Sequence, residues 1–132
     1  MSTKKIGANE RAQLQPGDIV VAPLDPVMGS ETAKRRPLIV VSAQALNAVS
    51  RTVTVVPLTS GKGAIMRLFP YLESSQTDCG KQGSAAITQM TSLDLVARDA
   101  ELVGSVIDPD FMDKLKLRMA AMFEITLDTL DR

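Results

Sequence analysis

The stretch that decides the fold runs from residue 17 to 60 and reads GDIVVAPLDPVMGSETAKRRPLIVVSAQALNAVSRTVTVVPLTS. It contains three short apolar runs, rich in β-branched residues and bounded by turn formers, at 18–24, 38–41 and 52–58. Such runs predict β-strands. The connection between the first two, 25–37, is polar and long, which is uncommon in a loop that has no function. We expect this loop to fold over a shallow groove and deliver Arg36 into it.

Outside this stretch, similar patterns predict more strands. The expected strands are 18–24, 37–42, 51–58, 64–72, 84–91 and 101–107, with a turn over 92–100. Pro70 marks a bend or an edge in the fourth strand, since proline cannot donate to a ladder. Ser42 is expected to cap a short helix over 43–48 through its hydroxyl.

A longer helix is predicted to begin at Asp108, the cap, with Pro109 in the first turn. Its apolar residues recur at three- and four-residue spacing and predict one core-facing side: Phe111, Leu115, Met119, Met122 and Phe123. A second interpretation is that part of this methionine-rich side meets a second copy of the chain. Short strands followed by one helix predict a mainly β fold, a small curved antiparallel sheet closed by the C-terminal helix.

Composition sets bounds on the class of protein. The 132 residues suit one domain, which we place at 16–132 after a flexible polar segment, 1–15. No apolar run is long enough to cross a bilayer, and the start lacks the apolar core of a signal peptide. The single cysteine, Cys79, cannot form an internal disulfide, which fits a reducing cytoplasm.

Charge is balanced overall but uneven along the chain. Residues 1–67 hold 9 Lys and Arg against 4 Asp and Glu, a net +5, and residues 68–132 hold 6 against 11, a net −5. A basic half around the predicted groove would suit a phosphate-bearing substrate. Equally, the two halves can fold together so that the charges intermingle.

The chain has no histidine, which excludes the usual imidazole acid–base pair, a Ser–His nucleophile and most zinc sites. No carboxylates have metal-ligand spacing, so we expect no metal and no cofactor. The turn 59–63 fails the phosphate-loop pattern at Val56 and Gly63. If the protein is a nuclease, the nucleophile can be the 2′-hydroxyl of RNA itself. A guanidinium that forks to phosphate oxygens then suits the transition state.

Several motifs in order resemble the MazF/PemK family of toxin endoribonucleases. They span most of the chain, Pro16 to Ile125, and comprise Gly17-Asp18-Ile19, Asp25-Pro26, Gly29-Ser30-Glu31, Arg36-Pro37, Val56 to Ser60, Gln89 to Asp94 and Ala97-Arg98. The resemblance implies an SH3-like barrel of the CcdB/PemK type that forms a homodimer. It also implies cytoplasmic, metal-independent, sequence-specific cleavage of single-stranded RNA to 2′,3′-cyclic phosphate and 5′-hydroxyl ends, with a cognate antitoxin as inhibitor.

The resemblance also assigns residues. Arg36 matches the family's catalytic arginine and Thr59 its active-site threonine, and the candidate substrate-binding residues are Glu31, Ser30, Arg35, Ser60, Lys62 and Gln89. Each also has a purely structural interpretation. Arg36 and Arg35 can be solvated surface residues, Thr59 and Ser60 can satisfy their turn, and Glu31 can anchor the loop.

The sequence departs from some relatives at three positions. Ser30 stands where they carry histidine, and they also carry an acidic residue at or near the position of Thr88 and an arginine near that of Ala86. A second hypothesis is therefore a non-enzymatic interaction module on the same fold. It could be a gyrase binder resembling CcdB, although the chain has no tryptophan, or a catalytically silent homologue.

Overall fold

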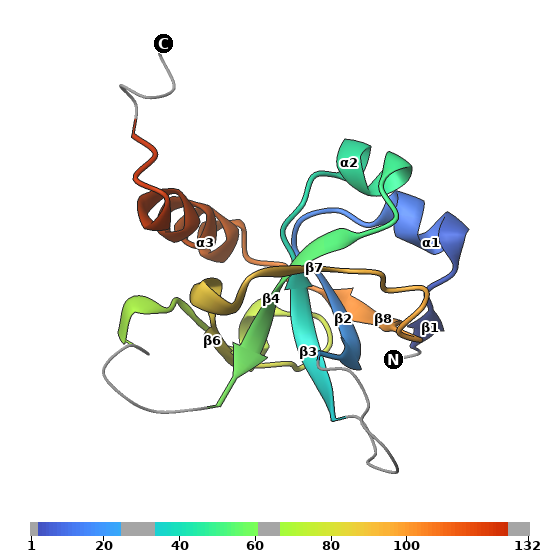
Figure 1. Cartoon of the computed structure of the whole chain (residues 1–132). Coiled ribbons are helices and arrows are strands. Elements are labelled where there is room, and N and C mark those ends of the chain that lie inside the picture. The colour runs from blue at the N-terminus through green and yellow to red at the C-terminus, as the bar shows by residue number, and fades with distance from the viewer. Residues whose placement is uncertain (1–2, 25–33, 61–66, 127–132) are drawn as a thin grey trace.

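The computed structural model describes residues 3–24, 34–60 and 67–126 (Figure 1). The strands are β1 Lys4–Lys5, β2 Asp18–Pro23, β3 Arg35–Val40, β4 Val53–Thr59, β5 Tyr71–Leu72, β6 Gly83–Ala85, β7 Thr91–Leu93 and β8 Glu101–Ser105. The helices are α1 Ala8–Gln13, α2 Gln44–Val49 and α3 Pro109–Met122, and η2 Ser74–Gln76 and η3 Ile87–Gln89 are 3₁₀ turns. The described residues thus form a mainly β fold with one C-terminal helix, as predicted.

The central strands are buried on both faces, which explains their continuous apolar runs. On one face Val20, Leu38, Val40 and Val55 pack with Ile6 and Leu14 from the N-terminal segment. On the other, Ile19, Ile39 and Val56 pack with Phe111 and Leu115 of α3. Figure 1 shows the consequence: α1 and α2 lie together on one side of the sheet and α3 lies on the other.

The sheet curls back on itself. Its strand order is β1-β8-β2-β3-β4-β6-β5, with β7 pairing with β4 outside that path. Beyond β5, Thr77 forms an isolated antiparallel bridge with Val106, just after β8. Asp78 N–H donates to the Ser105 carbonyl at 3.1 Å and Ile107 N–H to the Gln76 carbonyl at 2.8 Å. The two ends of the sheet therefore meet through a short bridge, as expected of a small barrel.

The N-terminal segment is part of this fold, so the predicted flexible stretch is wrong from Lys4 onward. β1 pairs with β8. Ile6 and Leu14, on either side of α1, are each only 1% exposed. Buried Asn47 of α2 donates to the Leu14 carbonyl at 2.9 Å. Two isolated apolar residues in a polar stretch gave too weak a pattern to reveal this packing.

Two predicted strands are also wrong in extent. In the strand predicted at 64–72, the described residues form only the short β5. A 3₁₀ turn occupies residues 67–68, and Pro70 has no backbone N–H to donate to a neighbouring strand. The strand predicted at 84–91 is interrupted by the turn η3, which separates β6 from β7. Both of these strands pair along the same edge of β4. The break lies where β4 passes from one part of the sheet to the other, so the curvature of the barrel interrupts the partner strand.

The starts of α2 and α3 lie close to where the sequence predicted them, but the predicted cap of α2 is wrong. Asp108 accepts from Asp110 N–H at 3.0 Å, as expected. Ser42 does not cap α2, which begins after Ala43. Instead its hydroxyl donates to Asn47 Oδ1 at 2.6 Å and accepts from Thr54 N–H at 3.0 Å.

The predicted core face of α3 is correct except at its end. Phe111 and Leu115 are buried, and Met119 and Met122 pack against the core. Phe123 lies outside, 61% exposed, because the helix ends there and Glu124 turns the chain with φ of 57°. Among the described helices, none has the length and apolar character needed to span a membrane.

Candidate active site

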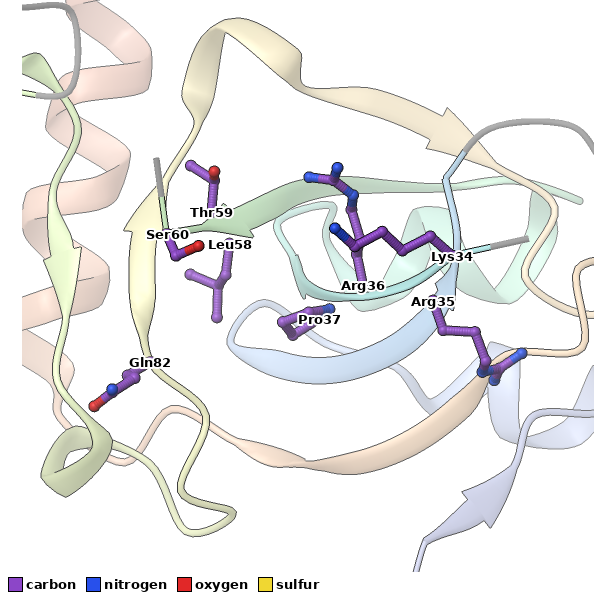
Figure 2. A pocket seen from close by; sticks show the side chains of 8 residues that line it. All are labelled: Lys34, Arg35, Arg36, Pro37, Leu58, Thr59, Ser60 and Gln82. Carbon is purple, nitrogen blue, oxygen red and sulfur yellow. The ribbon is translucent and has the colours of Figure 1, made fainter. Parts of the chain in front are cut away.

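A surface hollow of about 320 Å³ lies where β3 begins and β4 ends (Figure 2). It is lined by Lys34, Arg35, Arg36, Pro37, Leu58, Thr59, Ser60 and Gln82. Lys34, Arg35 and Arg36 form one side, although Arg35 directs its guanidinium to other protein groups, and no acidic residue is among these described lining residues. Hydroxyl and amide groups stand on the other side. The hollow is therefore suited to an anion that also offers hydrogen-bonding groups.

Arg36 and Thr59 line the same hollow from two neighbouring strands. β3 and β4 pair in antiparallel register from Val40 opposite Val55 to Leu38 opposite Pro57, and Arg36 and Thr59 each stand two residues beyond that last pair. Side chains that face each other across two strands share one face of the sheet. Figure 2 shows both side chains extending to the same side. Pro37 has no N–H to donate, which accounts for the end of the ladder at this point.

Arg36 is half-buried and offers its guanidinium to the hollow. Two ion pairs join described residues, Lys5 with Asp99 and Arg35 with Glu101, and neither includes Arg36. A guanidinium beside a hydroxyl can hold two oxygens of one phosphate group. The catalytic roles that the family resemblance implies for Arg36 and Thr59 stay a prediction.

Arg35 is oriented differently from its neighbour. Its Nη2 donates to the Val21 carbonyl at 3.0 Å and to the Asp99 carbonyl at 2.9 Å. The same atom lies 3.5 Å from Glu101 Oε1. In Figure 2 the side chain points away from the hollow, although the residue lines it. Arg35 is thus occupied by protein groups, and its predicted contact with substrate stays a prediction.

The other candidates divide into three groups. Ser60 lines the hollow, whereas Gln89 lies in η3 and is not among the lining residues. Ser30, Glu31 and Lys62 fall outside the described residues. Gln82 lines the hollow and was not predicted, because its place beside β4 depends on the pairing of β6.

The backbone of Thr59 lies very close to that of Gly83 in β6. Gly83, which follows Gln82, has φ of 145°, and a Cβ built on it would lie 3.0 Å from the Thr59 carbonyl oxygen and 3.3 Å from its nitrogen. Only glycine adopts this conformation readily and allows so close an approach. Gly83 therefore helps to set where Thr59 stands.

Two of the three departures from relatives, Ala86 and Thr88, are not among the residues that line this hollow. Ala86 is buried, and Thr88 lines a second, mostly apolar hollow of about 260 Å³ between α3 and the turn at Leu68. The described residues contain no group of three or more acidic or cysteine side chains that could hold a metal ion. The site's chemistry is thus that of cations, hydroxyls and amides.

Comparison with known proteins gives the family. A model described as PemK-like, MazF-like toxin of type II toxin–antitoxin systems matches residues 15–123. The chain belongs to this family. The endoribonuclease toxin ChpB of Escherichia coli K12 is 31% identical over 117 residues, which cover 87% of this chain and 98% of ChpB.

Solved structures agree on the fold. MazF of Deinococcus radiodurans (Form-I) superposes with a TM-score of 0.67 at 25% identity, over 84% of this chain and 96% of that one. A MazE–MazF structure from the same organism (Form-II) gives a TM-score of 0.72 at 24% identity, over 86% and 98%. The MazF-like fold predicted from the sequence is confirmed.

Proposed function

We propose that this protein is the toxin of a type II toxin–antitoxin system and acts as a metal-independent endoribonuclease on single-stranded RNA, including mRNA. The observation that carries the proposal is that Arg36, near the beginning of β3, and Thr59, at the end of β4, line one hollow that also holds Lys34. Membership of a family whose relative ChpB is an endoribonuclease toxin supports it. The proposed substrate places the activity in the cytoplasm, where mRNA is translated.

The chemistry assigned to the site needs no external nucleophile. The 2′-hydroxyl attacks the adjacent phosphorus, the P–O5′ bond breaks, and the products are a 2′,3′-cyclic phosphate and a 5′-hydroxyl. Arg36 donates to the non-bridging oxygens, where negative charge grows in the transition state. Thr59 holds a phosphate oxygen or orients the sugar, while Ser60 and Gln82 line the path of the flanking nucleotides.

Cleavage in the presence of a chelator tests the proposal. Purified protein is incubated with a long single-stranded RNA in excess EDTA, beside Arg36→Ala and the exposed control Arg51→Ala. We expect discrete fragments with 5′-hydroxyl ends from the wild type and Arg51→Ala, and none from folded Arg36→Ala. Intact RNA with the folded wild type would contradict the nuclease proposal.

The CcdB-like alternative predicts the opposite pattern. A gyrase binder would inhibit supercoiling by purified gyrase, and Arg36→Ala would leave that inhibition unchanged. A silent homologue would bind RNA or antitoxin without cutting. The same set of proteins, assayed for supercoiling and for RNA binding, separates these outcomes from cleavage.

Two protein partners complete the proposal: a cognate antitoxin and a second copy of this chain. The second hollow is lined by Leu68, which is 60% exposed, and by Met122, which directly precedes Phe123, itself 61% exposed. A patch of this kind favours an interface. For the antitoxin, acidic and apolar residues would complement the cations of the first hollow.

A further inference from the structure

Two arginines join one end of the β2–β3 pair to the neighbouring turn between β7 and β8. Arg98, in the turn between β7 and β8, donates through Nη1 to the carbonyls of Pro23 at 3.0 Å and Leu24 at 2.9 Å. Arg35, at the start of β3, donates to the Val21 carbonyl and to the Asp99 carbonyl of that turn. Both strand ends are therefore tied to residues 98–99.

The turn itself is well fixed. Asp94 Oδ1 accepts from Ala97 N–H at 3.0 Å, and Ala100 N–H returns to the Leu95 carbonyl at 3.0 Å. Asp99 adopts the left-handed conformation, φ 57°, that closes such a turn. Leu95 and Ala100 are fully buried in the core beneath it. A turn closed by these bonds and anchored in the core is a stiff support.

Arg36 belongs to β3, one of the two strands that these hydrogen bonds hold to the turn. The register sets Pro23 opposite Arg35 and Ala22 opposite Arg36, so Arg98 and Arg35 fix the backbone on both sides of the Arg36 position. Neighbouring residues in a strand point to opposite faces. Holding Arg35 on the turn therefore leaves Arg36 directed to the hollow.

We propose that Arg35 and Arg98 are positioning residues, which brace the β2–β3 end on the 94–100 turn so that Arg36 is held ready for the phosphate. This inference rests on the proposed nuclease function. It gives Arg35 a role different from the predicted contact with substrate, and the two roles make different predictions. A brace acts on the rate of the chemical step, whereas a phosphate contact acts mainly on RNA binding.

Single-turnover cleavage separates a brace from a phosphate contact. The maximal rate reports the chemical step, and the half-saturating protein concentration, with its dependence on salt, reports RNA binding. For Arg35→Gln and Arg98→Gln, we expect the maximal rate to fall about 10-fold or more, since small misplacements of a catalytic group are costly. The slope of log affinity against log salt should not change. Arg51→Gln, an exposed control, should match the wild type.

The charge-conserving variant Arg35→Lys adds a sharper contrast. A lysine keeps a phosphate contact but cannot reproduce the planar guanidinium that reaches two carbonyls and Glu101, so we expect it to behave like Arg35→Gln. The inference is overturned if Arg35→Gln lowers the salt slope by about 0.7, the value of one lost contact on a single strand, with the maximal rate unchanged. It is also overturned if neither glutamine variant alters the rate.

Hydrogen exchange followed by mass spectrometry tests the brace without RNA. In Arg35→Gln and Arg98→Gln, the peptide covering 35–40 should exchange faster, while the peptide covering 53–57 should be unchanged. Unchanged exchange at 35–40 would refute the brace. If the wild type cuts no RNA, the proposed function fails, and this measurement still decides whether the brace exists.

Discussion

At the scale of single residues, Arg36 carries the most weight in the proposed reaction. Arg36→Lys keeps the charge but loses the two-pronged donor, so we expect kcat to fall by about 10²-fold, with a larger loss for Arg36→Ala. Thermal unfolding should be unaltered, because neither ion pair between described residues involves this side chain. Single-turnover cleavage measures the effect. Full activity in Arg36→Lys would mean that only charge is needed.

Gly83 allows a second prediction, with Gly80 as its matched control. Both have positive φ, 145° and 75°, so an alanine at either should cost about 1–3 kcal/mol of folding stability. Only at Gly83 does the added Cβ press on Thr59, since nothing lies within 4 Å of it at Gly80. Gly83→Ala should therefore lose cleavage as well as stability, whereas Gly80→Ala should lose stability alone. Chemical denaturation and cleavage assays on both variants provide the comparison, and equal activity in the two would contradict it.

Sequence patterns identified some residues of the site and could not identify others. Arg36 and Thr59 were selected through the resemblance to the MazF/PemK family, since its place at a strand end alone would have left Arg36 a solvated surface residue. The role of Arg35 was not, since its partners Val21, Asp99 and Glu101 come from three different parts of the chain. Gln82 was missed for the same reason: no local pattern encodes which strand lies beside it.

At the scale of elements, strands and the long helix followed from local pattern, and the N-terminal segment did not. Its docking depends on Asn47, a polar residue that is only 1% exposed. The Asn47 amide donates to the Leu14 carbonyl at 2.9 Å and to the Ser42 carbonyl at 3.0 Å. A buried polar residue that satisfies distant backbone groups looks, in the sequence, like any surface asparagine.

Asn47→Ala should therefore loosen α1 from α2 and lower stability. Each buried group left without a partner costs about 1–3 kcal/mol, so we expect a total loss of about 2 kcal/mol or more. Gln44→Ala, an exposed position on the same helix, should be nearly neutral. Urea unfolding gives the free energies, and limited proteolysis should cut the variant first near α1. Equal stability of the two variants would rule out this role for Asn47.

At the scale of the whole molecule, an exposed ion pair joins the chain's start to the turn that supports the candidate site. Lys5 Nζ lies 2.9 Å from Asp99 Oδ1. This hydrogen bond, then the Lys5 charge and that of Arg35, lower the pKa of Asp99 below its ordinary value of 3.8. A lowered pKa means that the fold favours the carboxylate, so the stabilisation is complete above pH 3.8 and disappears as the pH falls through the folded-state pKa.

Asp99→Asn tests this pH dependence while keeping a side chain that tolerates the left-handed backbone. We expect the variant to be slightly less stable than the wild type near neutral pH, and the difference to vanish in strong acid. Because the pair is exposed, added salt should also shrink the difference. Urea midpoints measured from neutral to acidic pH, at low and high salt, give the result. A difference that persists in strong acid would assign the effect to something other than charge.

A dimer interface at the second, apolar hollow would be a property of the whole molecule. Leu68, 60% exposed, lines the apolar hollow, and Phe123, 61% exposed, directly follows Met122, which also lines it. Leu46 and Val49 on α2 are 59% and 83% exposed and do not line that hollow. If a second copy covers that hollow, the double variant Leu68→Ser/Phe123→Ser should shift a dimer to monomers, because burial of apolar area drives such association. Leu46→Ser/Val49→Ser, on the far side in Figure 1, should remain dimeric. Sedimentation velocity distinguishes the species, and dissociation by the α2 variant alone would place the interface on the opposite side of the sheet.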